Sequence, residues 1–294
     1  MSKIKVLVLP SDRTGVGKFR SVEPHIFLQN KFSEDFHVDI DYEPRVDDMN
    51  YWKQYDMVCF HRSIGRDYDI APMIIQRLNS MGIVTVMDLD DYWLPTMDHP
   101  AYHLVVQSKL HEKIMNNLKV SQYVTTTTSI FASEIKKFNK NVFVLPNAIN
   151  PDEPQFKAQT QPSDKIRFGW LGGSSHLHDI ELMSNGISSV HNSFKDKVQF
   201  VLCGFDLRGT VTEIDQEGKQ RQRSIQPTET VWYKYEKFFT EDYKVLSPQY
   251  KSFLNTFVDT PYSDENEPYR RRWTKDIKTY ASNYNTFDVS LAPL

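Results

Sequence analysis

The chain has 294 residues, and at ~150 residues per domain this length favours about two domains. Hydrophobic residues make up 39% of the sequence and charged residues 25%, which excludes a disordered or collagen-like chain. The 35 basic and 38 acidic residues leave a net charge of −3. Nucleic-acid-binding domains are usually basic, so we expect a protein that requires no nucleic acid.

The two cysteines, Cys59 and Cys203, both lie inside apolar runs. Two such cysteines exclude a disulfide framework and favour a reducing compartment. The first apolar run is too short for the core of a signal peptide, and no run approaches the roughly 18 apolar residues that cross a bilayer. We therefore expect a cytoplasmic protein without a transmembrane segment, and leave open a peripheral contact with a membrane.

Strand-like and helix-like patterns alternate through the first half of the chain. Apolar runs rich in β-branched residues predict strands at 4–9, 36–40, 57–60, 83–87, 123–126 and 142–145. Apolar residues at helical spacing predict helices near 71–81, across 104–118 and across 131–138, the last with Ser129 as its N-cap. This alternation indicates an α/β domain over residues 1–150, with a parallel sheet covered on both faces.

A proline-studded stretch interrupts the pattern and predicts a linker at 151–164. A second α/β domain is then expected over 165–294. Its predicted elements are a strand at 166–171, a helix at 177–190, a strand at 198–203, an exposed loop at 208–229, a strand at 231–235, helices at 248–257 and 274–284, and a strand at 288–291. Because the sequence stops directly after that strand, where a crossover helix normally follows, we expect this second domain to be incomplete.

The loop after the first strand is a candidate anion site. Gly15 and Gly17 would let a ligand approach the backbone, and the helix behind them would present free amides. The basic side chains of Arg13, Lys18 and Arg20 favour an anionic ligand. The loop lacks the spacing of a Walker A motif and of a complete dinucleotide-binding motif. An ordinary tight turn between strand and helix is the alternative.

A similar corner opens the second domain. Gly172, Gly173, Ser174 and His176 precede a helix and suit a diphosphate, although Ser175 could simply cap that helix. A histidine pair with His178 is a poor metal site, because residues two apart do not share a helix face. We expect no metal site.

Acidic and aromatic residues follow the strand at 83–87. Asp88, Asp90 and Asp91 would lie at the carboxyl edge of the sheet, where parallel folds hold ligands, and are candidate catalytic carboxylates. Helix capping by Asp90 and Asp91 is the alternative. Trp93 could pack against a sugar ring or belong to the core.

Two further basic features complete the candidates. His61 and Arg62 end the strand at 57–60 on the same edge. The run at 270–272 could receive phosphate, although such a run is usually a solvated face.

These pieces, in this order, resemble the GT-B glycosyltransferases of the group 1, or family four, class. The matching pieces are the glycines after the first strand, residues 125–129 before a helix, Val144-Leu145-Pro146-Asn147-Ala148-Ile149, Gly169-Trp170-Leu171-Gly172-Gly173 and Phe287-Asp288-Val289-Ser290-Leu291-Ala292-Pro293-Leu294. Asp88-Leu89-Asp90 also resembles the Asp-x-Asp metal motif of glycosyltransferases with the GT-A fold. That fold has a single domain, however, and the second strand–glycine–helix unit that begins at Ile166 has no place in it.

The resemblance implies two Rossmann-like domains facing across a cleft, with the nucleotide sugar held mainly by the second. The donor diphosphate would lie near Gly15, Gly17, Gly172, Gly173, Ser174 and His176. A carbohydrate or lipid-linked acceptor would lie near Arg20, His61, Arg62 and Trp93. Asp88 stands where many relatives have a histidine, and the sequence ends before the paired-glutamate segment of that family.

The predicted function is therefore transfer of a sugar from a nucleotide-sugar donor to an acceptor, with retention of anomeric configuration. No cofactor or divalent metal is expected. A non-catalytic nucleotide-sugar-binding module and a nucleotide-sugar epimerase are the alternatives.

Overall fold

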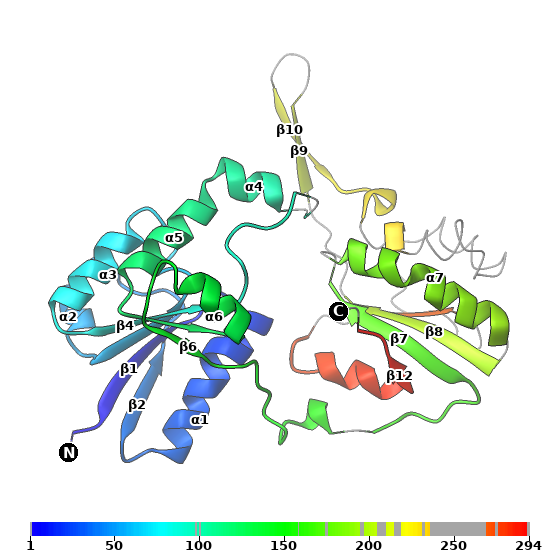
Figure 1. Cartoon of the computed structure of the whole chain (residues 1–294), viewed down its shortest axis with the longest axis horizontal. Coiled ribbons are helices and arrows are strands. Elements are labelled where there is room, and N and C mark those ends of the chain that lie inside the picture. The colour runs from blue at the N-terminus through cyan, green and yellow to red at the C-terminus, as the bar shows by residue number, and fades with distance from the viewer. Residues whose placement is uncertain are drawn as a thin grey trace. The chain divides into compact units, whose positions relative to one another are not determined.

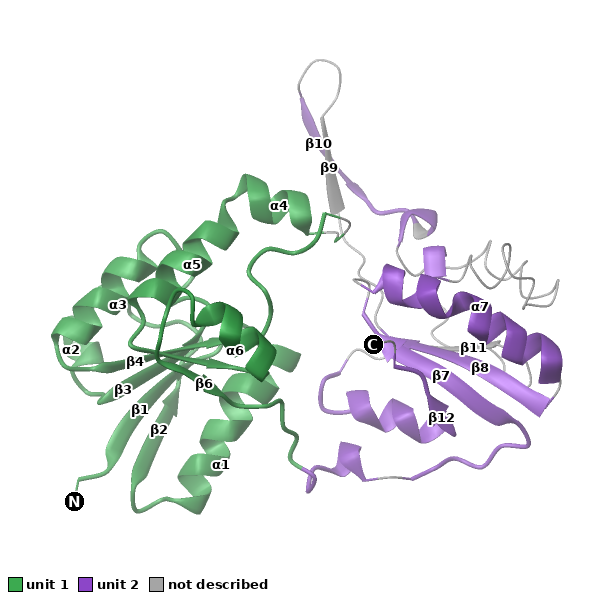
Figure 2. Ribbon diagram, viewed as in Figure 1, with its two compact units in different colours: residues 1–150 green, residues 151–294 purple. Residues whose placement is uncertain are grey.

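The computed structural model describes residues 2–97, 99, 101–157, 159–173, 176–194, 197–204, 210–214, 219–230, 233–235, 269–273 and 276–292. The chain divides into two compact units, residues 1–150 and 151–294 (Figure 2). Each unit contains a parallel sheet, which confirms the predicted α/β class.

Unit 1 is built on a six-stranded parallel sheet (Figure 1). Its strands, in spatial order, are β2 (Phe36–Ile40), β1 (Ile4–Leu9), β3 (Met57–His61), β4 (Val84–Leu89), β5 (Tyr123–Thr126) and β6 (Val142–Val144). All six predicted strands are confirmed, with ends shifted by no more than two residues. The strand order reverses beside β1, and such a reversal opens a crevice at the carboxyl ends of the strands.

Apolar side chains cover both faces of this sheet. Leu7 and Leu9 of β1 pack in one buried cluster with residues of α3 (Ala71–Ser80) and α5 (Leu110–Val120), while Val6 and Val8 pack on the opposite face with Val38. Successive strand residues point to opposite faces, so a strand buried on both faces is apolar throughout. The other helical segments are η1 (Gly17–Val22), α1 (Glu23–Lys31), α2 (Met49–Trp52), α4 (Tyr102–Gln107) and α6 (Ser129–Ile135).

Two helix predictions in unit 1 were wrong in detail. The single helix expected across 104–118 is two helices, α4 and α5, because Lys109 between them adopts a left-handed backbone with φ 53°. The N-cap of α6 is Thr128 rather than Ser129: the Thr128 hydroxyl accepts a hydrogen bond from the Phe131 amide at 3.1 Å. The helical spacing of apolar residues continues across the break at Lys109 and does not mark which residue caps α6, so the sequence pattern reveals neither.

Unit 2 contains a four-stranded parallel sheet in the order β11 (Tyr269–Trp273), β8 (Val198–Gly204), β7 (Ile166–Gly172) and β12 (Val289–Ser290). The helix α7 (Leu177–Phe194) follows β7. The predicted strands at 166–171, 198–203 and 288–291 and the predicted helix at 177–190 are confirmed, although β12 has only two residues. Short turns of 3-10 helix are η2 (Pro154–Phe156), η4 (Pro227–Glu229) and η6 (Tyr280–Thr286).

Other predictions for unit 2 need correction. The stretch expected as a loop contains an antiparallel hairpin of β9 (Thr210–Ile214) and β10 (Gln220–Ser224), since the β-branched residues of β9 favour a strand. Residues 233–235, expected in a strand, are helical, and the run at 270–272 lies on β11. Of the helix expected at 274–284, the described residues 277–279 form a turn and the 3-10 helix η6 begins only at Tyr280. The helix expected at 248–257 lies outside the described residues.

The segment predicted as a linker packs against the end of unit 2. Gln155 is buried and accepts a hydrogen bond from the Ala281 amide, and the amides of Gln159 and Gln161 bond to Asn285. Farther along, the buried Arg167 pairs with Asp288 at 3.2 Å. Hydrogen bonds from Arg167 hold the pKa of Asp288 below its ordinary value.

Two glycines of unit 2 differ in the space around them, one on the strand β7 and one on the helix α7. Substitutions at these glycines test how tightly the two elements are packed. A Cβ on Gly169 would lie 2.5 Å from the Val201 carbonyl oxygen, whereas a Cβ on Gly186 of α7 would meet nothing within 4 Å. Gly169→Ala should therefore destabilise the protein by about 1–3 kcal/mol through overpacking. Gly186→Ala should stabilise it by about 0.5–1 kcal/mol, because alanine is the better helix former. Urea denaturation measures both; equal effects of the two substitutions would contradict the packing described here.

Candidate functional site

The start of the helical segment after β1 is capped by a carboxylate from its own loop. Asp12 Oδ1 accepts hydrogen bonds from the amides of Thr14 at 2.7 Å and Gly17 at 3.2 Å, and Ser11 Oγ donates to Asp12 Oδ2 at 2.9 Å. Burial raises the pKa of Asp12, but these hydrogen bonds outweigh it and leave the pKa below the ordinary value. A Cβ on Gly17 would overlap the Asp12 carbonyl oxygen. In this structure the amide of Gly17 thus faces a carboxylate, and a donor-binding role for Gly15 and Gly17 stays a prediction.

The chain makes a strained turn directly after β3. Arg62 has a φ of 61°, and the Ser63 amide bonds back to the His61 carbonyl at 2.7 Å. A three-residue turn with positive φ is rare for a residue with a side chain, and such strain is found preferentially at functional sites. Two contacts hold the turn: the Arg62 amide donates to the Asp88 carbonyl at 3.1 Å, and the buried Asn117 donates to the Arg62 carbonyl at 2.9 Å.

This turn places His61 between a serine and an aspartate from two other strand ends. His61 Nδ1 lies 2.8 Å from Ser11 Oγ, and His61 Nε2 lies 2.8 Å from Asp90 Oδ1. Arg62 Nη2 lies 3.0 Å from carboxylate oxygens of both Asp90 and Asp91. The His61 side chain is 3% exposed and that of Asp90 11%, whereas Asp91 is 74% exposed. The structure therefore joins the predicted residues His61, Arg62 and Asp90 in one network, which is buried at His61 and largely buried at Asp90 but partly exposed at Arg62.

The charge of Asp90 is stabilised by its neighbours. Burial alone would raise the pKa of this carboxyl group. The hydrogen bond and charge of His61, together with those of Arg62, outweigh burial and hold the pKa of Asp90 far below its ordinary value. Asp90 is therefore an ionised partner for the His61 ring at neutral pH.

Asp88 and Arg20 form a second, separate cluster. Arg20 binds both carboxylate oxygens of Asp88, with its Nε 3.0 Å from Oδ2, and Thr125 Oγ1 donates to Asp88 Oδ1 at 2.7 Å. Arg20 Nη1 also donates to the Leu145 carbonyl at 2.6 Å and approaches Asn147 Oδ1 at 3.3 Å. The Arg20 side chain thus spans from the helix after β1 to the chain beyond β6. In this arrangement it is committed to protein partners, and its acceptor role stays a prediction.

Trp93 belongs to an aromatic cluster. Tyr92 stacks on Trp93 with ring centres 4.3 Å apart, and Phe138 meets Trp93 edge-on at 5.6 Å. Trp93 also packs against the main core of unit 1. The more exposed ring of the pair is Tyr92, and a sugar-binding role for Trp93 stays a prediction.

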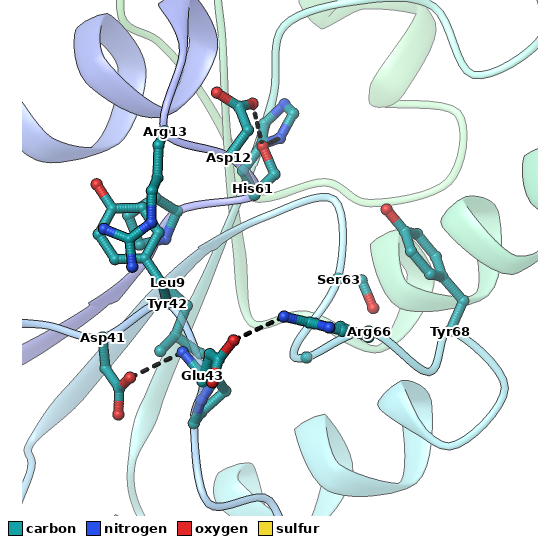
Figure 3. A pocket seen from close by; sticks show the side chains of 14 residues that line it. Leu9, Asp12, Arg13, Asp41, Tyr42, Glu43, His61, Ser63, Arg66 and Tyr68 are labelled. Atoms are coloured by element: carbon teal, nitrogen blue, oxygen red, sulfur yellow. Dashed lines mark hydrogen bonds and ion pairs between the residues drawn. The ribbon is translucent and has the colours of Figure 1, made fainter. Parts of the chain in front are cut away.

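A cavity of about 390 Å³ opens beside these strand ends (Figure 3). It lies beyond β1, β2 and β3, where the strand order reverses, and its volume is in the range of small-molecule sites. Ser11 and His61 belong to its wall, so the buried network reaches the cavity at these two residues. The lining residues are Leu9, Pro10, Ser11, Asp12, Arg13, Asp41, Tyr42, Glu43, Pro44, His61, Ser63, Gly65, Arg66 and Tyr68.

The corner that opens unit 2 is supported by two buried aromatic rings. Tyr235 Oη donates to the Gly173 carbonyl and accepts from the His176 amide, both at 2.9 Å, and its ring meets Trp170 edge-on. A Cβ on Gly172 would overlap the Trp170 indole, so the packing requires a glycine there, whereas a Cβ on Gly173 would meet nothing within 4 Å. The His176 ring is half-exposed and lies 2.7 Å from Asp179. The predicted site residue Ser174 lies outside the described residues.

Some residues of these sites were missed by sequence reasoning. Ser11, Tyr42 and Ser63 each follow the end of a strand, and this position is the signal that could have selected them. Thr125, near the end of β5, also reaches this edge, where its hydroxyl bonds to Asp88. For Tyr235 we find no such signal, because it lies 59 residues from His176 in sequence.

Comparisons with known proteins give structural resemblance only. No protein-family model and no curated protein matches the sequence. An alpha-glucosyltransferase in complex with UDP and a 13-mer DNA containing a HMU base is 11% identical, with a TM-score of 0.44 over 69% of this chain and 57% of that chain. The alpha,alpha-trehalose 6-phosphate synthase from Burkholderia multivorans is 9% identical, with a TM-score of 0.47 over 100% of this chain and 78% of that one. A glycotransferase of kitacinnamycin is 9% identical, with a TM-score of 0.36 over 68% and 65%.

The chain spans little more than half the length of the alpha-glucosyltransferase structures that it matches, 57% and 56%. None of the described helices is both long and apolar enough to cross a membrane. Within the described ranges, no group of three or more His, Cys, Asp and Glu side chains could hold a metal ion.

The ion pair of Asp90 makes a testable contribution to stability. Asp90→Asn should lower the free energy of unfolding by about 2 kcal/mol at pH 7, since a hydrogen bond to a charged group contributes ~1.5–3 kcal/mol. The pKa of Asp90 is lower in the folded than in the unfolded protein. The stabilisation is therefore complete above the unfolded value of about 3.9 and declines as the pH falls below it toward the folded value.

Urea denaturation followed by tryptophan fluorescence, repeated between pH 7 and pH 2, measures this difference between the wild type and Asp90→Asn. Asp91→Asn is the matched control, because the exposed Asp91 contacts the same arginine and should contribute less than about 1 kcal/mol. A difference that does not change with pH, or equal losses in both variants, would contradict the assignment.

Proposed function

We propose that the chain is a GT-B glycosyltransferase that moves a sugar from a nucleotide-sugar donor to a hydroxyl group of an acceptor. The observation that carries the proposal is the hydrogen-bonded series Ser11–His61–Asp90, which begins at the wall of a ligand-sized cavity and ends at an ionised carboxylate. The resemblance of the sequence pieces and the two parallel α/β units support the same assignment.

Ser11 is the residue of this series that would touch the acceptor. Its hydroxyl donates its one proton to Asp12 Oδ2, and His61 Nδ1 lies 2.8 Å from the same Ser11 oxygen. A lone pair of Ser11 Oγ then accepts a hydrogen bond from the acceptor hydroxyl and orients that oxygen toward the donor sugar. His61 and Asp90 act as positioning residues, because they fix the serine rather than contact the substrate.

In the transfer step the acceptor oxygen forms a bond to the anomeric carbon, and the bond from that carbon to the diphosphate oxygen breaks. As the new bond forms, the acceptor proton leaves its hydrogen bond to Ser11 Oγ and passes to the departing diphosphate, and the sugar keeps its anomeric configuration, as the resemblance implies. The barrier falls chiefly through stabilisation of the negative charge on the diphosphate. The corner of Gly173 and His176 at the amino end of α7 would supply this stabilisation, since helix N-termini favour anions.

The acceptor side is tested with His61→Gln. Loss of the ring removes the contacts to Ser11 and Asp90, and misplacement of the acceptor should lower kcat by about 10²-fold, with less effect on KM for the donor. Release of nucleoside diphosphate from UDP- and GDP-sugars, measured with and without an acceptor, provides the rate, and NMR of the product gives its anomeric configuration. His37→Gln is the matched control, because His37 of β2 is half-exposed and outside the cavity. Wild-type turnover by His61→Gln would overturn the proposed role.

The donor side is tested at Gly173, where the fold has room for a side chain. Gly173→Asp should abolish binding of UDP- and GDP-sugars and turnover, because a carboxylate would repel the diphosphate, while the unfolding temperature stays unchanged. Gly173→Ala controls for size without charge and should retain most of the affinity. Titration calorimetry measures both. Unchanged nucleotide binding by Gly173→Asp would discard the donor site, and wild-type binding without turnover would favour a non-catalytic module.

A further inference from the structure

The corner of Gly173 and His176, at the amino end of α7, is held by a side chain from far along the sequence. The Tyr235 hydroxyl donates a hydrogen bond to the Gly173 carbonyl and accepts one from the His176 amide, both at 2.9 Å. One oxygen atom thus bridges two backbone groups between the end of β7 and the start of α7. The bridge fixes how far apart these two groups lie and in which direction each one points.

The position of Tyr235 depends on a short helical turn. Residues 233–235 are helical, and the Thr230 hydroxyl accepts a hydrogen bond from the Tyr233 amide at 3.1 Å, as a capping residue does. Tyr235 is 0% exposed, and its ring meets that of Trp170 edge-on with the ring centres 5.8 Å apart. Because it has no exposed surface, Tyr235 cannot contact a ligand and acts only through the groups that it holds.

The Tyr235 hydroxyl keeps the Gly173 carbonyl turned inward. Burial raises the pKa of Tyr235, so at neutral pH the phenol retains the proton that it donates to this carbonyl. A carbonyl oxygen carries a partial negative charge and repels an anion. Since the Gly173 oxygen bonds to a buried hydroxyl, it is directed at the protein interior rather than at the exposed side of the corner, where a diphosphate would approach.

His176 is fixed at several points and keeps one ring nitrogen for a ligand. Its amide bonds to Tyr235, its carbonyl accepts from the Ile180 amide at 3.2 Å, and its Nδ1 lies 2.7 Å from Asp179 Oδ2. The ring also meets Trp170 edge-on at 5.8 Å. The side chain is 48% exposed, and within the described part of the chain no hydrogen bond engages Nε2. This nitrogen can donate to an anion when the ring is protonated, and the first amides of α7 have no partner within the helix.

We propose that Tyr235 is a positioning residue of the donor site, which orients the Gly173 carbonyl and the His176 backbone so that the corner is ready to receive the diphosphate. The inference rests on the proposed function, because the diphosphate is the group that this corner would hold. Donors that are already in place do not have to reorganise when charge develops on a departing group. Tyr235 therefore contributes to diphosphate binding without contact with the ligand.

The test is the substitution Tyr235→Phe, which removes one oxygen and leaves the ring to pack against Trp170, so the chain should fold. Titration calorimetry of the full chain with UDP and with GDP measures the dissociation constant. For the nucleotide that the wild type binds, this constant should rise about 5- to 10-fold in Tyr235→Phe. A variant that is merely destabilised would instead bind with an unchanged dissociation constant and a reduced stoichiometry, and this result would overturn the proposal.

The matched control is Tyr233→Phe, on the same helical turn. Tyr233 is partly buried, and its hydroxyl makes no hydrogen bond among the described residues. Its loss should therefore leave both dissociation constants at their wild-type values. Equal weakening of nucleotide binding by Tyr233→Phe and Tyr235→Phe would contradict a specific role for the Tyr235 hydroxyl.

Hydrogen exchange tests the bridge itself, without any ligand. The His176 amide should exchange faster in Tyr235→Phe than in the wild type, because its hydrogen-bond acceptor is gone, and should be unchanged in Tyr233→Phe. Unchanged exchange of this amide in Tyr235→Phe would overturn the bridge.

These outcomes separate the inference from the proposed function. Faster exchange of the His176 amide together with wild-type affinity for UDP and GDP in Tyr235→Phe would reject the positioning role and leave the glycosyltransferase standing. Failure of the wild-type chain to bind either nucleotide would reject the donor site of the proposed function, and the inference with it.

Discussion

The contact between His61 and Asp90 is the interaction on which the candidate site of unit 1 depends. It joins the ends of β3 and β4, and Ser11 extends it to the end of β1. The side chain of His61 is 3% exposed and that of Asp90 11%, and the carboxylate of Asp90 stays ionised there because His61 and Arg62 both contact it. The pair therefore stabilises the very arrangement that brings the serine to the cavity wall.

Backbone strain at Arg62 is the cost of this arrangement. A non-glycine residue held at positive φ costs on the order of 1–3 kcal/mol and persists only where its surroundings fix it. The surroundings here are the neighbouring strand end, through Asp88, and the buried Asn117 of α5. The strain turns the Arg62 side chain toward Asp90 and Asp91.

Two pairs of neighbouring residues, the carboxylates Asp88 and Asp90 and the glycines Gly172 and Gly173, show that residues close in sequence can have different structural roles. Asp88 and Asp90 are only two residues apart. Asp88 lies within β4 and pairs with Arg20, whereas Asp90 lies just beyond the end of β4 and contacts His61. The adjacent glycines differ in the same way: Gly172 is required by the indole of Trp170, whereas nothing nearby restricts a side chain at Gly173. Both distinctions come from residues that lie elsewhere in the fold.

The sequence by itself determined the α/β class, all six strands of unit 1, the three recognised strands of unit 2 and the edge on which the polar residues gather, because strand and helix periodicity are local properties of the chain. It did not determine the break at Lys109, the hairpin of β9 and β10, or the strand β11. Tertiary structure alone decided the partners: Ser11 and His61 are 50 residues apart, Arg20 and Leu145 are 125 apart. Hydrogen bonds over such separations depend on how the strands are ordered in the sheet, and no local pattern encodes that order.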